Sequence, residues 1–402
     1  MNLPPLPFQP RPVRRLHRPD PGEVWARIYD EPRVLTGCLE GWELYRSLRA
    51  KQGHAEKLAV LRSLYGDSPM RYFAQPPGSE GTCHYGEDLR NPNALPGSID
   101  GASFSAFAEQ MLSALEGGSG EYIYSQSMPV EPGSALHRAM EPNVLYFLRE
   151  QDVRPRIWVG SNGNVTSLHY DEFANFICMA EGTKRVTMFP PEALRDMYHM
   201  PFDRMMGDAQ GSAVRLMRPD LERFPRFRDA MRQAQVAVVN PGEVLLIPPL
   251  WWHHVESFGL NVMVNNWVLM LSLLELVGLQ RNLTRAIRLF HPRTARERAA
   301  ARPYFQDEAF ALSRLETPSG AERPTGEVAA LLEETRRVLE PMHSSWRRWQ
   351  ASLYDVFVFQ TGGEPFPAIP GELEALLARR AHSPYFFPNA DFVDELVARG
   401  EL

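Results

Sequence analysis

From about residue 121 the chain consists of short runs rich in β-branched and aromatic residues, with turn-forming residues between one run and the next. Helical patterns do not separate the runs, which disfavours a parallel βαβ sheet. Many short strands at this spacing are typical of an antiparallel sandwich or a double-stranded β-helix. The runs, in chain order, are EYIYSQ, RIWVG, VTSLHYD, NFICMA, RVTMF, VAVVN, VLLIP, HHVESF and LNVMVNNWV.

Helical patterns flank this β-rich segment, so we expect a mainly β fold with flanking helices. Apolar periodicity predicts helices over residues 42–65 and 103–116, with strands and loops between them. A polar insert interrupts the strands at 190–234, and later helices are expected at 271–290, 326–340, 343–358, 371–381 and 390–399. We therefore divide the chain into an N-terminal arm with supporting helical and β elements (1–120), a β core (121–270) and a C-terminal helical region (271–402).

Charge and cysteine content narrow the class of protein. The net charge of −6 gives no overall attraction to nucleic acid. The three cysteines lack metal-type spacing and do not form a disulfide framework, which fits a reducing cytosol.

The N-terminal stretch has no apolar core of signal-peptide length. The most apolar window, 262–279, is interrupted by Asn265, Asn266 and Glu275, so a buried strand followed by a helix is favoured over a membrane span. We expect a cytoplasmic protein.

The sequence VTSLHYDE places a histidine and an aspartate two positions apart on a predicted strand. Side chains two apart on a strand point the same way. His169 and Asp171 therefore present one nitrogen and one oxygen ligand on one face. Alone, this pattern is so common that a hydrogen-bonded histidine–aspartate pair is the favoured interpretation.

A second histidine-bearing segment, NPGEVLLIPPLWWHHVES, follows later in the chain. A histidine from this segment, His253 or His254, could return across the sandwich and complete a two-histidine, one-carboxylate triad. That facial arrangement leaves open coordination positions and marks non-haem Fe(II) oxygenases. The alternative is a pair of ordinary strand histidines beside two tryptophans.

An Fe(II) enzyme that uses 2-oxoglutarate also needs a cation for the far carboxylate of that cosubstrate. Lys184 follows the turn Glu181–Thr183, and its point charge suits a carboxylate deep in a barrel. Thr166 lies three residues before His169 and offers a hydroxyl to the same carboxylate. Lys184 could instead be a solvated lysine beside a turn, although the chain has only three lysines.

The two segments together resemble a known family. VTSLHYDEFANFICMAEGTKRVTMFPP and PGEVLLIPPLWWHHVESF, followed by VMVNNW, are similar to the JmjC (cupin-like) Fe(II)- and 2-oxoglutarate-dependent oxygenases. Within that family the sequence is most similar to the asparaginyl hydroxylase that inhibits hypoxia-inducible factor and to its bacterial relatives. The resemblance runs from about Tyr122 to Trp267, and it implies a double-stranded β-helix (jelly-roll, cupin) core.

The resemblance also implies roles for individual residues. Fe(II) would be held by His169, Asp171 and His253, with 2-oxoglutarate and O₂ as cosubstrates. The C5 carboxylate of 2-oxoglutarate would be bound by Lys184, Thr166 and Tyr124, and its iron-bound part would lie beside Asn175 and Asn265. The substrate would contact Gln126 and Trp267. Asn266 departs from the family pattern, which has an aromatic residue there.

The activity implied is hydroxylation of a side chain in a protein or peptide. The alternatives are a hydroxylase of a modified tRNA base or a small metabolite, and a non-catalytic metal-binding cupin. Demethylation of N-methyl-lysine is chemically feasible but has no supporting feature in the sequence, and fold analogy alone does not choose a substrate. By the same resemblance, the C-terminal helices are expected to form a homodimer, or else to pack on the outside of the barrel.

Overall fold

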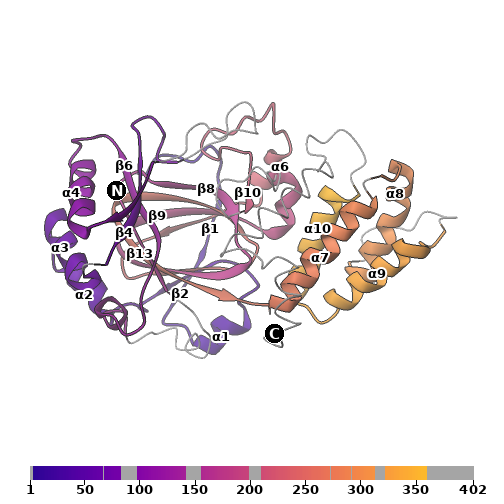
Figure 1. Ribbon diagram of the computed structural model, residues 1–402, viewed down its shortest axis with the longest axis horizontal. Coiled ribbons are helices and arrows are strands. Elements are labelled where there is room, and N and C mark those ends of the chain that lie inside the picture. The colour runs from indigo at the N-terminus through magenta and orange to yellow at the C-terminus, as the bar shows by residue number, and fades with distance from the viewer. Residues whose placement is uncertain are drawn as a thin grey trace. The chain divides into compact units, whose positions relative to one another are not determined.

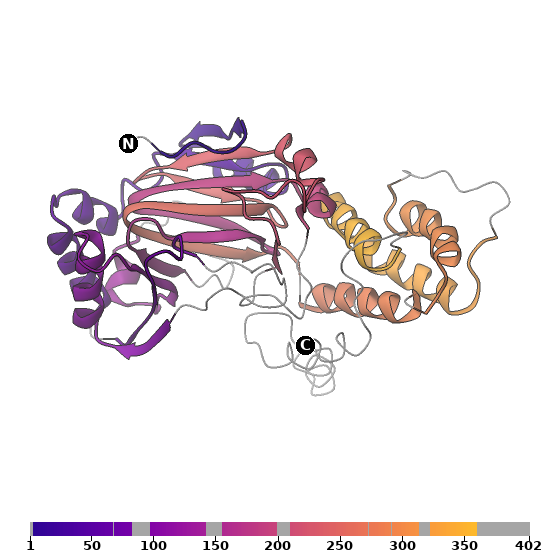
Figure 2. The same ribbon diagram turned by 90° about the horizontal axis from the view of Figure 1, so that it is seen from above.

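The computed structural model describes residues 3–66, 68–82, 97–141, 155–198, 210–271, 273–290, 292–312 and 322–359. The expected helices at 371–381 and 390–399 lie outside these residues. The chain divides into two compact units, the first made of residues 1–190 and 214–270 and the second of residues 191–213 and 271–402. The three-part division expected from the sequence remains a proposal. Figures 1 and 2 show the elements of each unit.

The first unit is built on two sheets that share two long strands, β9 (Phe173–Phe189) and β13 (Trp252–Leu269). One sheet has the order β2-β3-β12-β9-β13-β7-β6-β4-β5. In the other, β9 and β13 lie between β11 and β8, and β1 adds to β11. The bounds are β1 (Arg11–Pro12), β2 (Arg14–His17), β3 (Arg33–Thr36), β4 (Met70–Gln75), β5 (Gly97–Ala102), β6 (Tyr122–Pro129), β7 (Arg156–Gly160), β8 (Val165–Tyr170), β11 (Gln235–Val239) and β12 (Val244–Ile247).

β9 and β13 pass from one sheet to the other, so several of the expected short strands are continuous. NFICMA and RVTMF both belong to β9, and HHVESF and LNVMVNNWV both belong to β13. The pairing of the two strands shifts register between Phe258 and Met263. Such irregularities bend a strand and re-aim its side chains. The result is a jelly-roll barrel, which confirms the expected mainly β core with flanking helices.

Gly182 makes the bend in β9 sterically feasible. Its φ is +75°, and a Cβ there would lie 2.3 Å from the backbone oxygen of Leu260. Before the bend, the odd-numbered residues Ile177 and Met179 face the inner core; after it, the even-numbered Val186 and Met188 do so. The change of parity turns Lys184 to the inside of the barrel, on the same side as these inner residues.

Two hydrophobic clusters lie on opposite faces of the larger sheet. The inner cluster lies on the inside of the barrel and includes Ile177, Val186 and Met263. The outer cluster packs Phe176, Val262 and other outward side chains of the sheet against the N-terminal helices, of which those over residues 43–65 and 104–115 lie together beside the sheet in Figure 1. The N-terminal helices are α1 (Pro21–Ala26), α2 (Glu43–Arg49), α3 (His54–Tyr65), α4 (Phe104–Leu115) and α5 (Ala135–Arg138).

The helix expected over 42–65 is in fact two helices. The sequence analysis missed the break, which falls between Arg49 and His54. Gly53 is the N-cap of α3, and its backbone N–H donates to the Glu56 carboxylate at 3.2 Å. This local capping bond starts a new helix where apolar periodicity alone suggests continuity.

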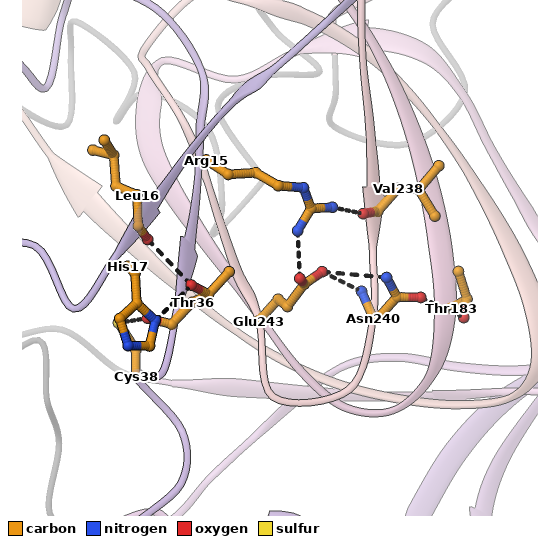
Figure 3. A network of polar contacts seen from close by, with 9 residues as sticks. All are labelled: Arg15, Leu16, His17, Thr36, Cys38, Thr183, Val238, Asn240 and Glu243. Carbon is orange, nitrogen blue, oxygen red and sulfur yellow. Dashed lines mark hydrogen bonds and ion pairs between the residues drawn. The ribbon is translucent and has the colours of Figure 1, made fainter.

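An arginine of β2 attaches the N-terminal arm to the barrel, as Figure 3 shows. Arg15 is ion-paired with Glu243 and donates to the Val238 carbonyl at 2.6 Å. Glu243 also accepts from the backbone N–H of Asn240 at 2.8 Å, and Asn240 accepts from the Thr183 hydroxyl at 3.3 Å. The network therefore connects β2 with the turn before β12 and with the bend in β9.

The second unit is helical and has an aromatic core. Its described elements are η2 (Pro191–Met197), β10 (Gln210–Gly211), α7 (Leu273–Phe290), α8 (Ala295–Tyr304), η4 (Phe305–Ala309), α9 (Gly326–Leu339) and α10 (Ser344–Phe357). Phe305 lies within 6.0 Å of Phe290, Tyr354 and Phe359, measured between ring centroids. The C-terminal helices expected at 271–290, 326–340 and 343–358 correspond to α7, α9 and α10.

None of the described helices combines the length and apolar character needed to cross a membrane. The remaining helix, α6 (Phe227–Met231), belongs to the first unit.

Candidate active site

His169, Asp171 and His253 come together on adjoining elements of the barrel. His169 on β8 is the register partner of His253 on β13, and their ring centroids are 4.1 Å apart. Asp171 follows β8 directly, and its Oδ2 is 3.8 Å from His253 Nε2. One ligand atom from each residue lies within 4.8 Å of the other two. Of His253 and His254, therefore, His253 joins the cluster.

The backbone sets the direction of both imidazole rings. His169 Nδ1 is 2.7 Å from the carbonyl oxygen of Ser167, and His253 Nδ1 is 2.9 Å from that of Trp251. A carbonyl only accepts, so each Nδ1 carries the proton and each Nε2 keeps its lone pair. Such outer contacts fix the tautomer of metal-binding histidines. Both rings are thus prepared to offer Nε2 to a cation.

The electrostatic surroundings favour the metal-binding form of His253. Burial lowers the pKa of its imidazole to about 4, and the neighbouring His169 adds to this, while Asp171 and the Trp251 carbonyl oppose it. The ring is therefore neutral near pH 7, and a neutral imidazole is the form that binds metals.

Asp171 is held from two sides. Its backbone carbonyl accepts from the N–H of Leu250 at 2.8 Å, and its Oδ2 accepts from Nε1 of Trp267 at 3.2 Å. Trp267 was expected to line the substrate side of the site. The structure also makes it an anchor for the carboxylate that completes the triad.

Lys184 is buried inside the barrel, and no carboxylate of the described residues is paired with it. Its side chain is 1% exposed, and its Nζ donates to the Ser257 hydroxyl at 2.7 Å. Burial lowers the pKa of the ammonium to about 7. Among the described residues, none forms an ion pair with it. A buried cation without a counter-ion is costly unless a ligand supplies the negative charge. Lys184 is therefore not the solvated lysine that the sequence left as an alternative.

Tyr124 lies next to this ammonium, and Thr166 lies next to Tyr124. Lys184 Nζ is 5.6 Å from the centroid of the Tyr124 ring. Burial raises the pKa of the Tyr124 phenol, and a hydrogen bond with Thr166 opposes that change. The phenol is therefore protonated near neutral pH and can donate a hydrogen bond. An ammonium and two hydroxyl groups at one place form a suitable set of donors for a carboxylate.

Gly160 on β7 makes room for the Tyr124 ring. A Cβ at Gly160 would lie 2.9 Å from Cδ2 of Tyr124 and 3.2 Å from the side-chain nitrogen of Asn164. Neither neighbour can move freely, because Tyr124 is 2% exposed and Asn164 is fully buried. Residue 160 must therefore be glycine for the Tyr124 ring to keep its place beside Lys184.

The Gly160→Ala substitution is expected to displace Tyr124 and to weaken binding at Lys184. Overpacking of this kind costs about 1–3 kcal/mol of stability. We expect a lower melting temperature and a rise of several-fold in the dissociation constant for 2-oxoglutarate, measured by calorimetry. Gly53→Ala is the matched control, because no atom lies within 3.7 Å of a Cβ there. Equal 2-oxoglutarate affinity in both variants would contradict the assigned role of Gly160.

Of the remaining expected residues, Asn175 is the register partner of Trp267, which donates to Asp171, and Asn265 contacts Asn175. Asn265 Nδ2 is 3.5 Å from Asn175 Oδ1, and both side chains are buried. Asn265 also accepts from Trp158 Nε1 at 2.7 Å. Gln126 is half-buried on β6. The structure brings the metal triad together, and it groups Lys184, Thr166 and Tyr124 as a second cluster.

Sequence reasoning missed two side chains of this region, Ser257 and Trp158. Ser257 pairs with Lys184 in the ladder between β13 and β9. It stands four residues after His253, so strand alternation could have indicated that both face the same side. Trp158 lies on β7, away from either motif, and only the fold brings it to Asn265.

The donor set fits a divalent transition metal. Two imidazoles and one carboxylate, gathered on one side of a possible ion, are the facial set of non-haem Fe(II) sites with open positions. Lys184 supplies an unpaired cation in the same barrel interior, as an anionic cosubstrate would require. A jelly-roll barrel with this set defines a protein of the cupin type with a candidate metal centre.

Comparison with known proteins places the chain in a family. A model described as the cupin-like domain matches residues 26–271, which is more than half of the chain. The chain belongs to this cupin-like JmjC family, whose members include 2-oxoglutarate-dependent oxygenases, some of them demethylases.

Several curated proteins are similar over part of the chain. Lysine-specific demethylase JMJ31 of Arabidopsis thaliana is 26% identical over 280 residues, which cover 61% of this chain and 47% of that protein. HSPB1-associated protein 1 of Homo sapiens is 30% identical over 203 residues, 50% of this chain and 40% of that protein. Lysine-specific demethylase 8 of Xenopus tropicalis is 32% identical over 118 residues, 29% of this chain and 26% of that protein. The chain thus spans less than half the length of each of these relatives.

Proposed function

We propose that this protein is an Fe(II)- and 2-oxoglutarate-dependent oxygenase that hydroxylates a side chain of a protein or peptide. The observation that carries the proposal is the coexistence, inside one barrel, of the His169–Asp171–His253 cluster and the unpaired ammonium of Lys184. A metal-storage cupin needs the first feature but has no use for the second. Membership of the JmjC family supports the same activity.

Each residue has a distinct part in this proposal. His169, Asp171 and His253 would hold Fe(II), and Trp267 would keep the Asp171 carboxylate in place. Lys184, Thr166 and Tyr124 would bind the far carboxylate of 2-oxoglutarate. Bound Fe(II) would activate O₂, so that one oxygen atom is inserted into a C–H bond of the substrate and the other is used in the oxidation of 2-oxoglutarate to succinate and CO₂.

At the metal end, amide groups would orient the cosubstrate. Asn175 and Asn265 are buried on adjoining strands and share a contact at 3.5 Å. Buried amides need partners, and the oxo-acid end of 2-oxoglutarate offers oxygen acceptors to them. The half-buried Gln126 is proposed to contact the protein or peptide that is hydroxylated.

The test of the proposed function is a turnover assay with a product screen. The Fe(II)-loaded protein should convert 2-oxoglutarate to succinate, and peptides from a cell extract should gain one oxygen atom, seen as a mass increase of about 16 Da. A modified tRNA base or a small metabolite would be revealed by the same mass increase in RNA or metabolite fractions. Metal binding without any succinate formation would instead identify a non-catalytic cupin.

Lysine demethylation is a second candidate, favoured by the names of two relatives, both of which are called lysine-specific demethylases. The same hydroxylation at an N-methyl carbon gives an unstable product that releases formaldehyde and leaves the amine without that methyl group. The two candidates therefore differ in their products. A retained oxygen atom supports side-chain hydroxylation, whereas formaldehyde with loss of a methyl group supports demethylation.

Two wider expectations belong to this proposal. A cytoplasmic location fits the buried, unbridged Cys38 and Cys178. A homodimer through the C-terminal helices stays a prediction, based on the apolar stripes of α7, α9 and α10. Light scattering of the full chain over a dilution series would check it, and a monomer at micromolar concentration would refute it.

A further inference from the structure

Trp158 is an inward-facing residue of β7. Its neighbours Ile157 and Val159 belong to the outer core, while Trp158 packs against the inner cluster. This follows from the alternation of side chains along a strand. Its side chain is only partly buried, although the residue faces inward.

Trp158 is the middle member of a run of contacts between the two halves of the site. At one end, Lys184 Nζ lies 5.6 Å from the Tyr124 ring. The Tyr124 ring lies 5.8 Å from that of Trp158, which lies 6.2 Å from that of Trp267. At the other end, Trp267 donates to Asp171. An aromatic wall thus extends from the ammonium to the carboxylate of the metal cluster.

The orientation of the Trp158 ring within this wall is fixed. Its Nε1 donates to Asn265 Oδ1 at 2.7 Å. The ring meets the Trp267 ring edge to face, with 79° between their planes. An indole held by a hydrogen bond and by two ring contacts is a rigid surface, unlike a methionine or a leucine, which could rotate to admit a longer ligand.

We propose that Trp158 determines the chain length of the 2-oxo dicarboxylate that the barrel accepts. This inference rests on the proposed function, since it assumes that one ligand reaches both Lys184 and the metal cluster. Trp158 would lie beside a ligand that extends from the Lys184 ammonium to the metal cluster. It would restrict the length of that ligand to an acid whose far carboxylate contacts Lys184 while its oxo-acid end contacts the metal. It is a specificity-determining residue that belongs to neither sequence motif.

The experiment compares two acids that differ by one methylene group. Binding of 2-oxoglutarate and of 2-oxoadipate is measured by calorimetry on the full chain loaded with Mn(II), so that turnover does not interfere. In the Trp158→Leu variant, the dissociation constant for 2-oxoglutarate should rise about tenfold, because one methylene in a shaped site is worth about 10–200-fold. The preference for 2-oxoglutarate over 2-oxoadipate should fall by about the same factor. Affinity for Mn(II) alone should stay within about twofold of wild type, because Trp158 contacts none of the three ligands directly.

Two further variants separate selectivity from stability. Trp158→Phe keeps a ring but loses the bond to Asn265, so we expect a smaller change of preference in the same direction. Trp25→Leu is the control, because Trp25 is also a half-buried tryptophan but packs against the outer core. The control should lower the melting temperature without changing the preference between the acids. If Trp158→Leu is unfolded by circular dichroism, the Trp158→Phe variant decides the question.

The outcomes distinguish this inference from the proposed function. Wild-type protein that binds 2-oxoglutarate, together with folded Trp158 variants of unchanged preference, overturns the role of Trp158 alone. Wild-type protein that binds neither acid contradicts the oxygenase proposal, and the inference fails with it. A changed preference between 2-oxoglutarate and 2-oxoadipate in the Trp158 variants, but not in Trp25→Leu, supports both the role of Trp158 and the oxygenase proposal.

Discussion

Replacing Asp171 by alanine should abolish succinate formation while the protein remains folded. The carboxylate is the anionic member of the metal cluster, so its loss removes both a ligand and the charge that offsets the cation. Loss of an outer contact to a metal ligand typically costs 10–100-fold in affinity or activity, and loss of the ligand itself should cost more than about 100-fold. Asp171 is not part of either hydrophobic cluster, so we expect circular dichroism to be unchanged.

The measurement has two readouts, turnover of 2-oxoglutarate and binding of Co(II) followed by its visible absorption. Both should be lost together in Asp171→Ala. Asp229→Ala is the matched control, because Asp229 is exposed and its ion pair with Arg232 lies on the surface, a contact of small expected value. An Asp171→Ala variant with full turnover would remove the triad from the mechanism.

Replacing Lys184 by methionine should raise the KM for 2-oxoglutarate by more than an order of magnitude. Truncating one partner of a buried charge pair costs about 2–5 kcal/mol, which corresponds to roughly 30- to 5,000-fold. Methionine retains much of the buried apolar stem and removes the ammonium. Binding of Co(II) should be unaffected, because the triad does not include Lys184. The control is Lys51→Met, at an exposed lysine.

The same substitution should not destabilise the ligand-free protein. Burial lowers the pKa of Lys184 from 10.5 to about 7. The folded state therefore bears the cost of the buried charge below about pH 7, and this cost disappears as the pH rises towards 10.5. Removal of the charge relieves it, so the melting temperature of Lys184→Met near pH 7 should be no lower than that of wild type. A large loss of stability would show that the lysine is a structural element instead.

The affinity for 2-oxoglutarate should also depend on pH through Lys184. In the free protein the ammonium loses its proton as the pH rises through about 7, whereas a bound carboxylate favours the charged form. Binding therefore takes up a proton above pH 7, and the dissociation constant should rise by up to about tenfold per pH unit there. In Lys184→Met this dependence should disappear, which a calorimetric pH series would reveal.

The sequence motifs predict the parts of this structure that depend on local patterns. Alternation along a strand places His169 and Asp171 on one face, and the family resemblance selects His253 over His254. The parity change at Gly182 could not be predicted, because it depends on the close approach of β9 to the backbone of Leu260. The expected turn between NFICMA and RVTMF is, in the structure, a bend inside one strand.

The side chains that sequence analysis missed are those whose neighbours come from distant parts of the chain. Trp158 and Asn265 are 107 positions apart, and Lys184 and Ser257 are 73 positions apart. Neither pair has a local signature, since each depends on the order in which the strands lie side by side. A motif identifies the ligands of a site, but the walls between them follow from topology.

The attachment of the N-terminal arm has a consequence for the synthesis of the chain. Arg15 and Glu243 are 228 positions apart, so at 5–20 residues per second the arm leaves the ribosome roughly 10–50 s before its partner. β1 waits about as long for its ladder partner β11, which begins at Gln235, and an unpaired strand could pair with a neighbouring nascent chain in that time. Five prolines between residues 4 and 12 and four arginines between residues 11 and 18 oppose such pairing. The composition of the arm is thus suited to the interval before β11 has been synthesised, as much as to the folded barrel.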